Sequence, residues 1–113
     1  MDLENTRSQM RKGILEYCIL CIIERHECYA SDIIDRMKDA RLIVVEGTLY
    51  PLLTRLKNAG LLGYKWEESK SGPPRKYYTL TDEGREFLNG LHLTWQELSG
   101  ATENILENKK NTL

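Results

Sequence analysis

Basic side chains gather in the middle of this 113-residue chain. The segment from Thr54 to Lys76 holds six basic residues against two acidic ones, although the whole chain carries a formal net charge of −1. Ammonium and guanidinium groups bind phosphate oxygens, and phosphates are the charged groups of nucleic acids. The six residues are Arg55, Lys57, Lys65, Lys70, Arg75 and Lys76. This separation of basic from acidic residues predicts a phosphate-binding face on a domain that is otherwise acidic. The alternative is that the basic residues cluster by chance on a solvated surface.

A short amphipathic helix should begin near Glu46 to Thr48 and end at Gly60. Pro51 is tolerated only close to a helix start, and glycine is a common stop. The apolar face of this helix consists of Leu49, Leu52, Leu53 and Leu56. The opposite face carries Thr48, Tyr50, Thr54, Arg55 and Asn58. Hydroxyl, aromatic and guanidinium groups suit base edges and phosphates better than the Glu and Lys of an ordinary solvated face.

A β-hairpin is expected directly after this helix. Leu62, Tyr64 and Trp66 alternate with polar residues in the first strand, and Tyr78 and Leu80 do so in the second. We expect residues 69–74 to form a loop longer than a tight turn, stiffened by Pro73 and Pro74. Lys70, Arg75 and Lys76 would then lie at the tip and base of the hairpin. A helix beside a basic hairpin is the layout of a winged helix-turn-helix, with Pro73, Arg75 and Lys76 as wing contacts to DNA.

Two helices precede this unit. The first is expected to begin near Thr6 to Met10 and to end near Arg25, before a polar turn over residues 25–29. Its start places Arg11 and Lys12 where they can add phosphate contacts. The second helix should run from Ala30 to about Ala40. The apolar, β-branched residues 42–45 then favour a brief edge strand.

The last helix should begin after Thr81, which is a suitable N-cap. Six residues in this helix follow one another at spacings of three and four, as in a heptad seam: Leu88, Leu91, Trp95, Leu98, Thr102 and Ile105. Because the seam follows a complete domain, its expected partner is a second copy of the chain. The sequence therefore predicts a mainly α fold with a small β-hairpin. Residues 1–80 would form the winged-helix domain with its N-terminal arm, 81–108 a dimerisation helix and 109–113 a frayed tail.

Other chemistries find little support in the sequence. Cys18 and Cys21 form a C-x-x-C followed by His26 and Cys28, which would suit zinc. The pair lies within an apolar helical stretch, however, so we interpret these cysteines as core residues with no metal. His26 and His92 lack a neighbouring acid and nucleophile, so neither an enzyme nor a cofactor is expected. The polar N-terminus and the short apolar runs predict a cytoplasmic protein with no membrane contact.

Three segments together resemble the PadR family of bacterial transcriptional regulators. Residues 10–20 are similar to the opening helix of that family, 46–56 to its recognition helix, and 72–84 to its wing and exit. The resemblance covers about residues 10–106, and the single helix after the wing is similar to the smaller PadR subfamily. The second helix departs from the family at Ser31, where an aromatic residue is frequent.

This resemblance implies a homodimeric repressor that binds a palindromic operator. Thr48, Tyr50 and Arg55 correspond to the recognition helix, and Pro73, Arg75 and Lys76 to the wing. In multidrug-sensing members, a tryptophan in the position of Trp95 stacks on flat aromatic effectors between two subunits. Trp95 is accordingly either a ligand platform or only an interface anchor. A different class of function, a winged-helix docking module that binds protein and not DNA, is the alternative.

Overall fold

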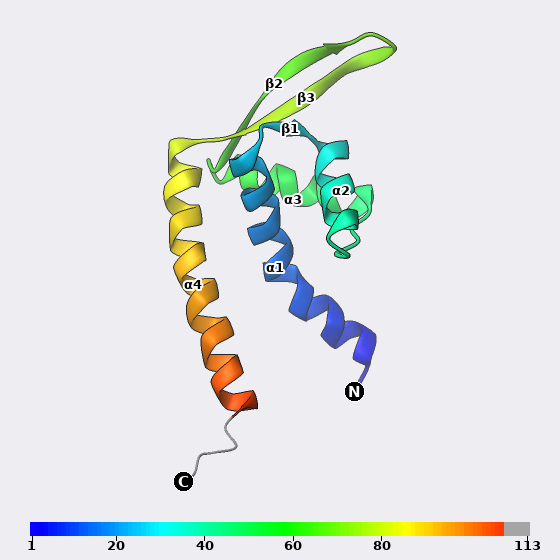
Figure 1. Cartoon of the computed structure of the whole chain (residues 1–113). Coiled ribbons are helices and arrows are strands. Elements are labelled where there is room, and N and C mark those ends of the chain that lie inside the picture. The colour runs from blue at the N-terminus through cyan, green and yellow to red at the C-terminus, as the bar shows by residue number, and fades with distance from the viewer. Residues whose placement is uncertain (108–113) are drawn as a thin grey trace.

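The computed structural model describes residues 1–107, which form helices, three strands and a few short connections (Figure 1). The elements are α1 (Leu3–Arg25), β1 (Cys28–Tyr29), α2 (Ala30–Asp39), α3 (Glu46–Asn58), β2 (Leu62–Ser69), β3 (Gly72–Leu80) and α4 (Asp82–Leu106). The tail predicted for residues 109–113 lies outside the described part of the chain.

Helix α1 begins earlier than its apolar stripe predicts. The side chain of Asp2 accepts a hydrogen bond from the backbone N–H of Glu4 at 2.9 Å and so caps the helix. Residues 3–13 are exposed, whereas the second half of the helix is buried through Leu15, Ile19 and Ile23 among others. The first half therefore extends away from the body of the domain (Figure 1).

The strands form one antiparallel sheet in the order β1-β3-β2. The edge strand predicted at residues 42–45 was wrong, since this segment is an irregular connection that buries Val44 in the core. The edge is supplied instead by β1, in which Cys28 pairs with Tyr78 and Tyr29 with Tyr77. A strand needs a partner edge as well as β propensity, and the segment just before α2 is the one that reaches β3.

The hairpin is tighter than the predicted six-residue loop. Strand β2 ends at Ser69 and strand β3 begins at Gly72, so only Lys70 and Ser71 lie between them. Pro73 and Pro74 belong to β3, beside an irregularity in the register between Glu67 and Ser69. Proline is tolerated there because β1 ends before this point and needs no N–H from it. The result is a long ribbon that projects beyond the helices (Figure 1).

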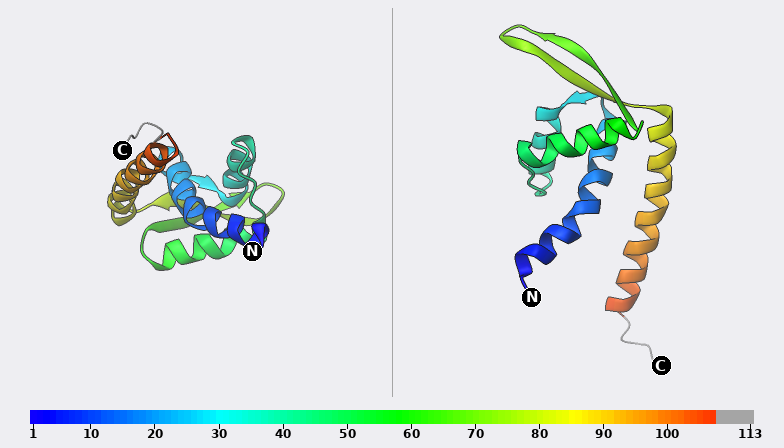
Figure 2. Two further views of the ribbon diagram at one scale, coloured as in Figure 1. Left: turned by 90° about the horizontal axis from the view of Figure 1, so that it is seen from below. Right: turned by 180° about the vertical axis from the view of Figure 1, so that it is seen from behind.

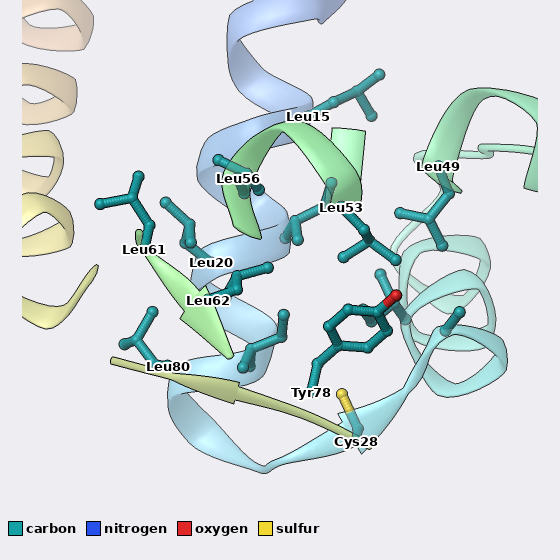
Figure 3. Close-up of a cluster of buried hydrophobic side chains, with 14 of the residues drawn as sticks. Leu15, Leu20, Cys28, Leu49, Leu53, Leu56, Leu61, Leu62, Tyr78 and Leu80 are labelled. Atoms are coloured by element: carbon teal, nitrogen blue, oxygen red, sulfur yellow. The ribbon is translucent and has the colours of Figure 1, made fainter. Parts of the chain in front are cut away.

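The core lies between α1, α2, α3 and the base of the sheet (Figure 3). Leu49, Leu53 and Leu56 of α3 are buried, as the leucine stripe predicts. Tyr78 and Cys28 reach this core from the paired strands β3 and β1. Helix α3 ends as expected, because Gly60 takes a left-handed conformation at φ 84°. The core thus fixes α3 with its polar face outward.

The first turn of α4 is fixed to the end of α3. The hydroxyl of Thr81 lies 2.7 Å from the carbonyl oxygen of Gly60 and 3.0 Å from that of Leu61, and it also accepts the N–H of Gly84 at 2.9 Å. A Cβ on Gly84 would lie 2.0 Å from the Leu61 carbonyl oxygen, so only glycine allows this approach. The orientation of α4 is thereby tied to that of α3.

The architecture is the predicted one: mainly helical, with a three-stranded sheet whose hairpin forms a wing and with a long helix after it. Helix α4 and the first half of α1 extend to the same side of the molecule, away from the wing (Figure 2). No helix in residues 1–107 combines the length and the apolar character needed to cross a membrane.

Candidate nucleic-acid interface

The polar face of α3 is exposed, but its side chains divide between two flanks. Tyr50 borders a depression shared with Tyr29 at the start of α2 and with Trp66 and Lys76 of the wing. Arg55 lies on the other flank and faces α1. Five residues along an α-helix correspond to a rotation of about 140°, which separates the two side chains. Thr54 lies nearer the wing, in a groove also lined by Lys57 and Tyr64.

Arg55 is engaged with a carboxylate. Its Nε lies 3.3 Å from Oε2 of Glu16 on α1, an ion pair without the geometry of a hydrogen bond. The Glu16 side chain is 20% exposed and that of Arg55 is 67% exposed. An ion pair with so exposed a partner is weak, because water screens it. The pair leaves most of the Arg55 side chain exposed to solvent.

Aromatic rings hold Lys76 of the wing beside α3. Its Nζ lies 4.6 Å from the ring centre of Tyr64 and 5.5 Å from that of Trp66. Lys57 of α3 approaches the same Tyr64 ring, at 5.9 Å. Cations over ring faces gain electrostatic attraction without losing their charge. Lys57, Tyr64 and Trp66 are thus added to the candidate contacts. The two lysines belong to α3 and β3 and the rings to β2, so no local pattern in the sequence pairs them.

Arg75 is held in a similar way at the base of α2. Its Cζ lies 3.9 Å from the ring centre of Tyr29, and its Nη1 donates a hydrogen bond to the Ser31 hydroxyl at 3.4 Å. These residues are 44 or more positions apart in sequence, so no local pattern pairs them. Glu46, at the start of α3, borders the same depression and adds a negative charge to it.

Two of the four basic residues of α1 lie beside the first half of α3, on the flank that faces α1. Arg11 and Lys12 border a hollow that Thr48 and Pro51 of α3 also line. Pro73, at the tip of the wing, is exposed and is not among the residues lining this hollow. The structure therefore brings Arg11 and Lys12 together with the recognition-helix candidates and places the wing candidates on the opposite flank of α3.

The predicted seam on α4 needs one correction. Leu88 is fully buried against the rest of the domain, so it cannot face a second subunit. Phe87, four residues before Leu91, is 49% exposed and lies on the side that Leu88 was expected to occupy. Leu91 is half-buried against the core. The remaining members are exposed: Trp95, Leu98, Thr102 and Ile105.

Trp95 has aromatic neighbours within its own subunit. The ring of Tyr17 on α1 lies 6.3 Å from that of Trp95 and makes an edge contact with His92 at 5.4 Å. A hydrogen bond of 2.7 Å joins the Tyr17 hydroxyl to Nδ1 of His92, and Nε2 of His92 lies 3.7 Å from Glu24. The Trp95 side chain is nevertheless 44% exposed. One part of its surface thus remains open for a partner or a ligand.

The cysteines lie on or near the buried side of α1. Cys18 and Cys21 are half-buried against the core, and burial raises the pKa of both thiols. Cys28 is buried in β1, where the loss of solvation raises the pKa of its thiol to about 11. Across residues 1–107, no group of three or more Cys, His, Asp or Glu side chains is arranged to hold a metal ion.

Comparison with known proteins identifies this architecture. The model of the transcriptional regulator PadR-like family matches residues 19–90. A PadR-like transcription factor from Bacteroides fragilis is 60% identical, with a TM-score of 0.78 over 89% of this chain and 98% of that one. A PadR-like transcriptional regulator from Bacillus cereus is 39% identical, with a TM-score of 0.78 over 88% and 97%.

A further similar structure is that of Bacillus subtilis PadR in complex with operator DNA. It is 26% identical, with a TM-score of 0.64, and the match covers 69% of this chain and 46% of that one. The family is one of transcriptional regulators and not of enzymes. The family match over more than half of the sequence and these close structures show that the chain belongs to the PadR-like family of transcriptional regulators.

Proposed function

We propose that this protein is a homodimeric repressor that binds a palindromic operator in double-stranded DNA. The observation that carries the proposal is the arrangement of cations around α3. Lys76 and Arg75 flank it on the wing side, and Arg11, Lys12 and Arg55 on the α1 side. The Bacillus subtilis relative, solved with operator DNA, supports it. Acting on chromosomal DNA would place the protein in the cytoplasm.

The geometry suggests a role for each element. Helix α3 would enter a major groove, with Tyr50 and Thr54 facing base edges. Arg55 would leave Glu16 for a phosphate. The wing, with Pro73, Arg75 and Lys76, would follow the backbone or the adjacent minor groove. The remaining contacts, from Thr48, Arg11 and Lys12, would fall on flanking phosphates and fix the register of the protein on the duplex.

Dimerisation would use the exposed face of α4. Trp95, Leu98 and Ile105 are 44%, 60% and 75% exposed, and a contiguous exposed apolar patch of this kind marks an interaction surface. Their spacing of three and seven residues keeps them on one side of the helix, with Thr102 between them. Because Thr81 and Gly84 tie α4 to α3, a dimer through α4 would set the distance between two recognition helices.

An aromatic effector would act at the same interface. Two-fold symmetry would bring two Trp95 rings close together, and a flat molecule between them would alter the angle of α4. Since α4 is fixed to the end of α3, such a change would move the recognition helices and relieve repression.

The single helix after the wing fits the smaller PadR subfamily.

A salt series distinguishes this proposal from a docking module. DNA affinity of the wild type should fall steeply with salt, and Lys76→Ala should lower the slope of log K against log salt by about one unit. Arg85→Ala is the control, because Arg85 belongs to α4 and is not among the residues that line the hollows around α3. Binding that is independent of salt, or equal slopes in all three proteins, would contradict the proposal and favour the docking module.

A further inference from the structure

We propose that Tyr29 is a positioning residue for DNA binding, because it holds Arg75 of the wing in the place from which the guanidinium meets a phosphate. The inference rests on the proposed function. The guanidinium carbon lies 3.9 Å from the Tyr29 ring centre, and Nη1 reaches the Ser31 hydroxyl at 3.4 Å. Arg75 is thus the wing cation that bridges to the start of α2.

Tyr29 is itself firmly held. Its backbone N–H donates to Oδ2 of Asp32 at 2.9 Å, at the point where β1 becomes α2. Its backbone pairs with Tyr77 of β3, and the two rings meet edge to face at 5.1 Å. The backbone of Tyr29 is therefore held by both β3 and the first turn of α2, and its ring packs against Tyr77. A tyrosine held in this way gives the stacked Arg75 side chain a fixed surface.

Arg75 has an obvious competing partner, which it does not use. Glu67 lies directly opposite on β2, where an ion pair across the strands would be expected. The Glu67 carboxylate is instead 3.9 Å from Nζ of Lys65, and Arg75 turns to Tyr29 and Ser31. The guanidinium is consequently directed towards α2 and α3, where it lines one depression with Tyr50, Lys76 and the acidic Glu46.

Stacking also preserves the binding capacity of the guanidinium. Its five N–H donors lie in the plane of the group, so a ring against one face leaves them free, and Ser31 takes one of them. An arginine on a projecting hairpin would otherwise lose much side-chain freedom when it bound DNA. Stacking on Tyr29 already orders the Arg75 side chain in the free protein, so less side-chain entropy is lost when it binds a phosphate.

A double-mutant cycle tests this assignment, with a mixed-sequence DNA duplex at low salt as the probe. Tyr29→Leu should weaken binding about two- to fivefold, the equivalent of an exposed cation–aromatic contact. Tyr29→Phe keeps the ring face and should bind as the wild type does. In the Arg75→Ala background, Tyr29→Leu should have no further effect on affinity. In the Lys70→Ala background it should keep its full effect, because Lys70 is an exposed wing cation in the turn between β2 and β3, away from Tyr29.

The outcomes are separable. Equal losses from Tyr29→Leu with and without Arg75 would show that Tyr29 acts by itself, and would overturn the inference while leaving DNA binding in place. Failure of Tyr29→Phe to restore affinity would overturn it too. A wild type that does not bind the duplex would refute the proposed function itself. Thermal unfolding checks that each variant is folded, and Tyr29→Met replaces the leucine variant in the cycle if the latter does not fold.

Discussion

Arg55 of α3 lies against Glu16 of α1, with its Nε 3.3 Å from the carboxylate oxygen Oε2. That oxygen is shielded from solvent and makes no hydrogen bond within the described residues. A charged oxygen in this position is poorly solvated, and its main compensation is a guanidinium that is itself two-thirds exposed. If Arg55 binds DNA as proposed, Glu16 would compete with the phosphates for it, and the exposed ion pair itself adds little to stability.

The first prediction follows from this competition. Glu16→Gln should tighten DNA binding roughly two- to fivefold, since an exposed ion pair is worth at most about 1 kcal/mol. The free energy of unfolding should change by less than about 1 kcal/mol for the same reason. Glu24→Gln is the control, because it removes an equal charge from α1 beside His92. Equal tightening in both variants would mean that overall charge, and not release of Arg55, is responsible.

The second prediction concerns the dimer. Leu98→Asp should convert the dimer to a monomer or an aggregate, because an unpaired charge buried in the seam costs several kcal/mol. Leu93→Asp is a closely matched control, since Leu93 is 64% exposed and Leu98 60%, on different sides of α4. Light scattering at micromolar concentration should show a dimer for the wild type and for Leu93→Asp only. A dimer that survives Leu98→Asp would place the interface elsewhere.

The third prediction concerns alkaline pH. Burial raises the pKa of the Cys28 thiol from 9.0 to about 11, so the folded state favours the neutral thiol more than the unfolded state does. This contribution to stability is complete below pH 9 and is lost as the pH rises towards 11. The loss is on the order of 2 kcal/mol.

Chemical denaturation at pH 8 and at pH 10.5 measures this effect. The wild type should lose more unfolding free energy between the two values than Cys28→Ala does, although the variant is less stable at pH 8. Other buried acids, such as Tyr78, are common to both proteins and cancel in the comparison. Identical losses in the two proteins would refute the assignment of the effect to Cys28.

The fourth prediction concerns an effector. A flat cationic aromatic dye should quench the fluorescence of Trp95 and weaken DNA binding, because the ring is partly open at the proposed two-fold axis. Trp66 is 61% exposed and adds its own signal. Trp66→Phe should therefore keep the quenching and Trp95→Phe should lose most of it. If Trp95→Phe is quenched as strongly as the wild type, Trp95 is only an interface anchor.

Local patterns were sufficient to predict most of the fold. The leucine stripe of α3, its stop at Gly60 and the N-cap at Thr81 depend on neighbouring residues, and each is found as expected. The failures involve distant partners. Residues 42–45 have strand character, but the edge of β3 is occupied by Cys28 and Tyr29, which the sequence does not indicate.

In the candidate site, too, the features set by local sequence were predictable and those set by tertiary packing were not. Exposure of Tyr50, Thr54 and Arg75 could be predicted from helical and strand periodicity. The ion pair of Arg55 with Glu16 and the stacking of Arg75 on Tyr29 could not, because each joins elements that only tertiary packing brings together. Leu88 was misassigned because a heptad pattern does not distinguish the side of α4 that faces α1 and the core from the side that faces a partner.

The central claim is that two copies of α3 read one symmetric DNA site, and selection of bound fragments from random DNA tests it most directly. Purified protein at physiological salt should enrich an inverted repeat whose half-sites lie about 10 base pairs apart, or a multiple of that, as two successive major grooves require. Enrichment of a single, unrepeated half-site would contradict the dimeric arrangement. No enrichment over the starting pool would contradict sequence-specific DNA binding itself.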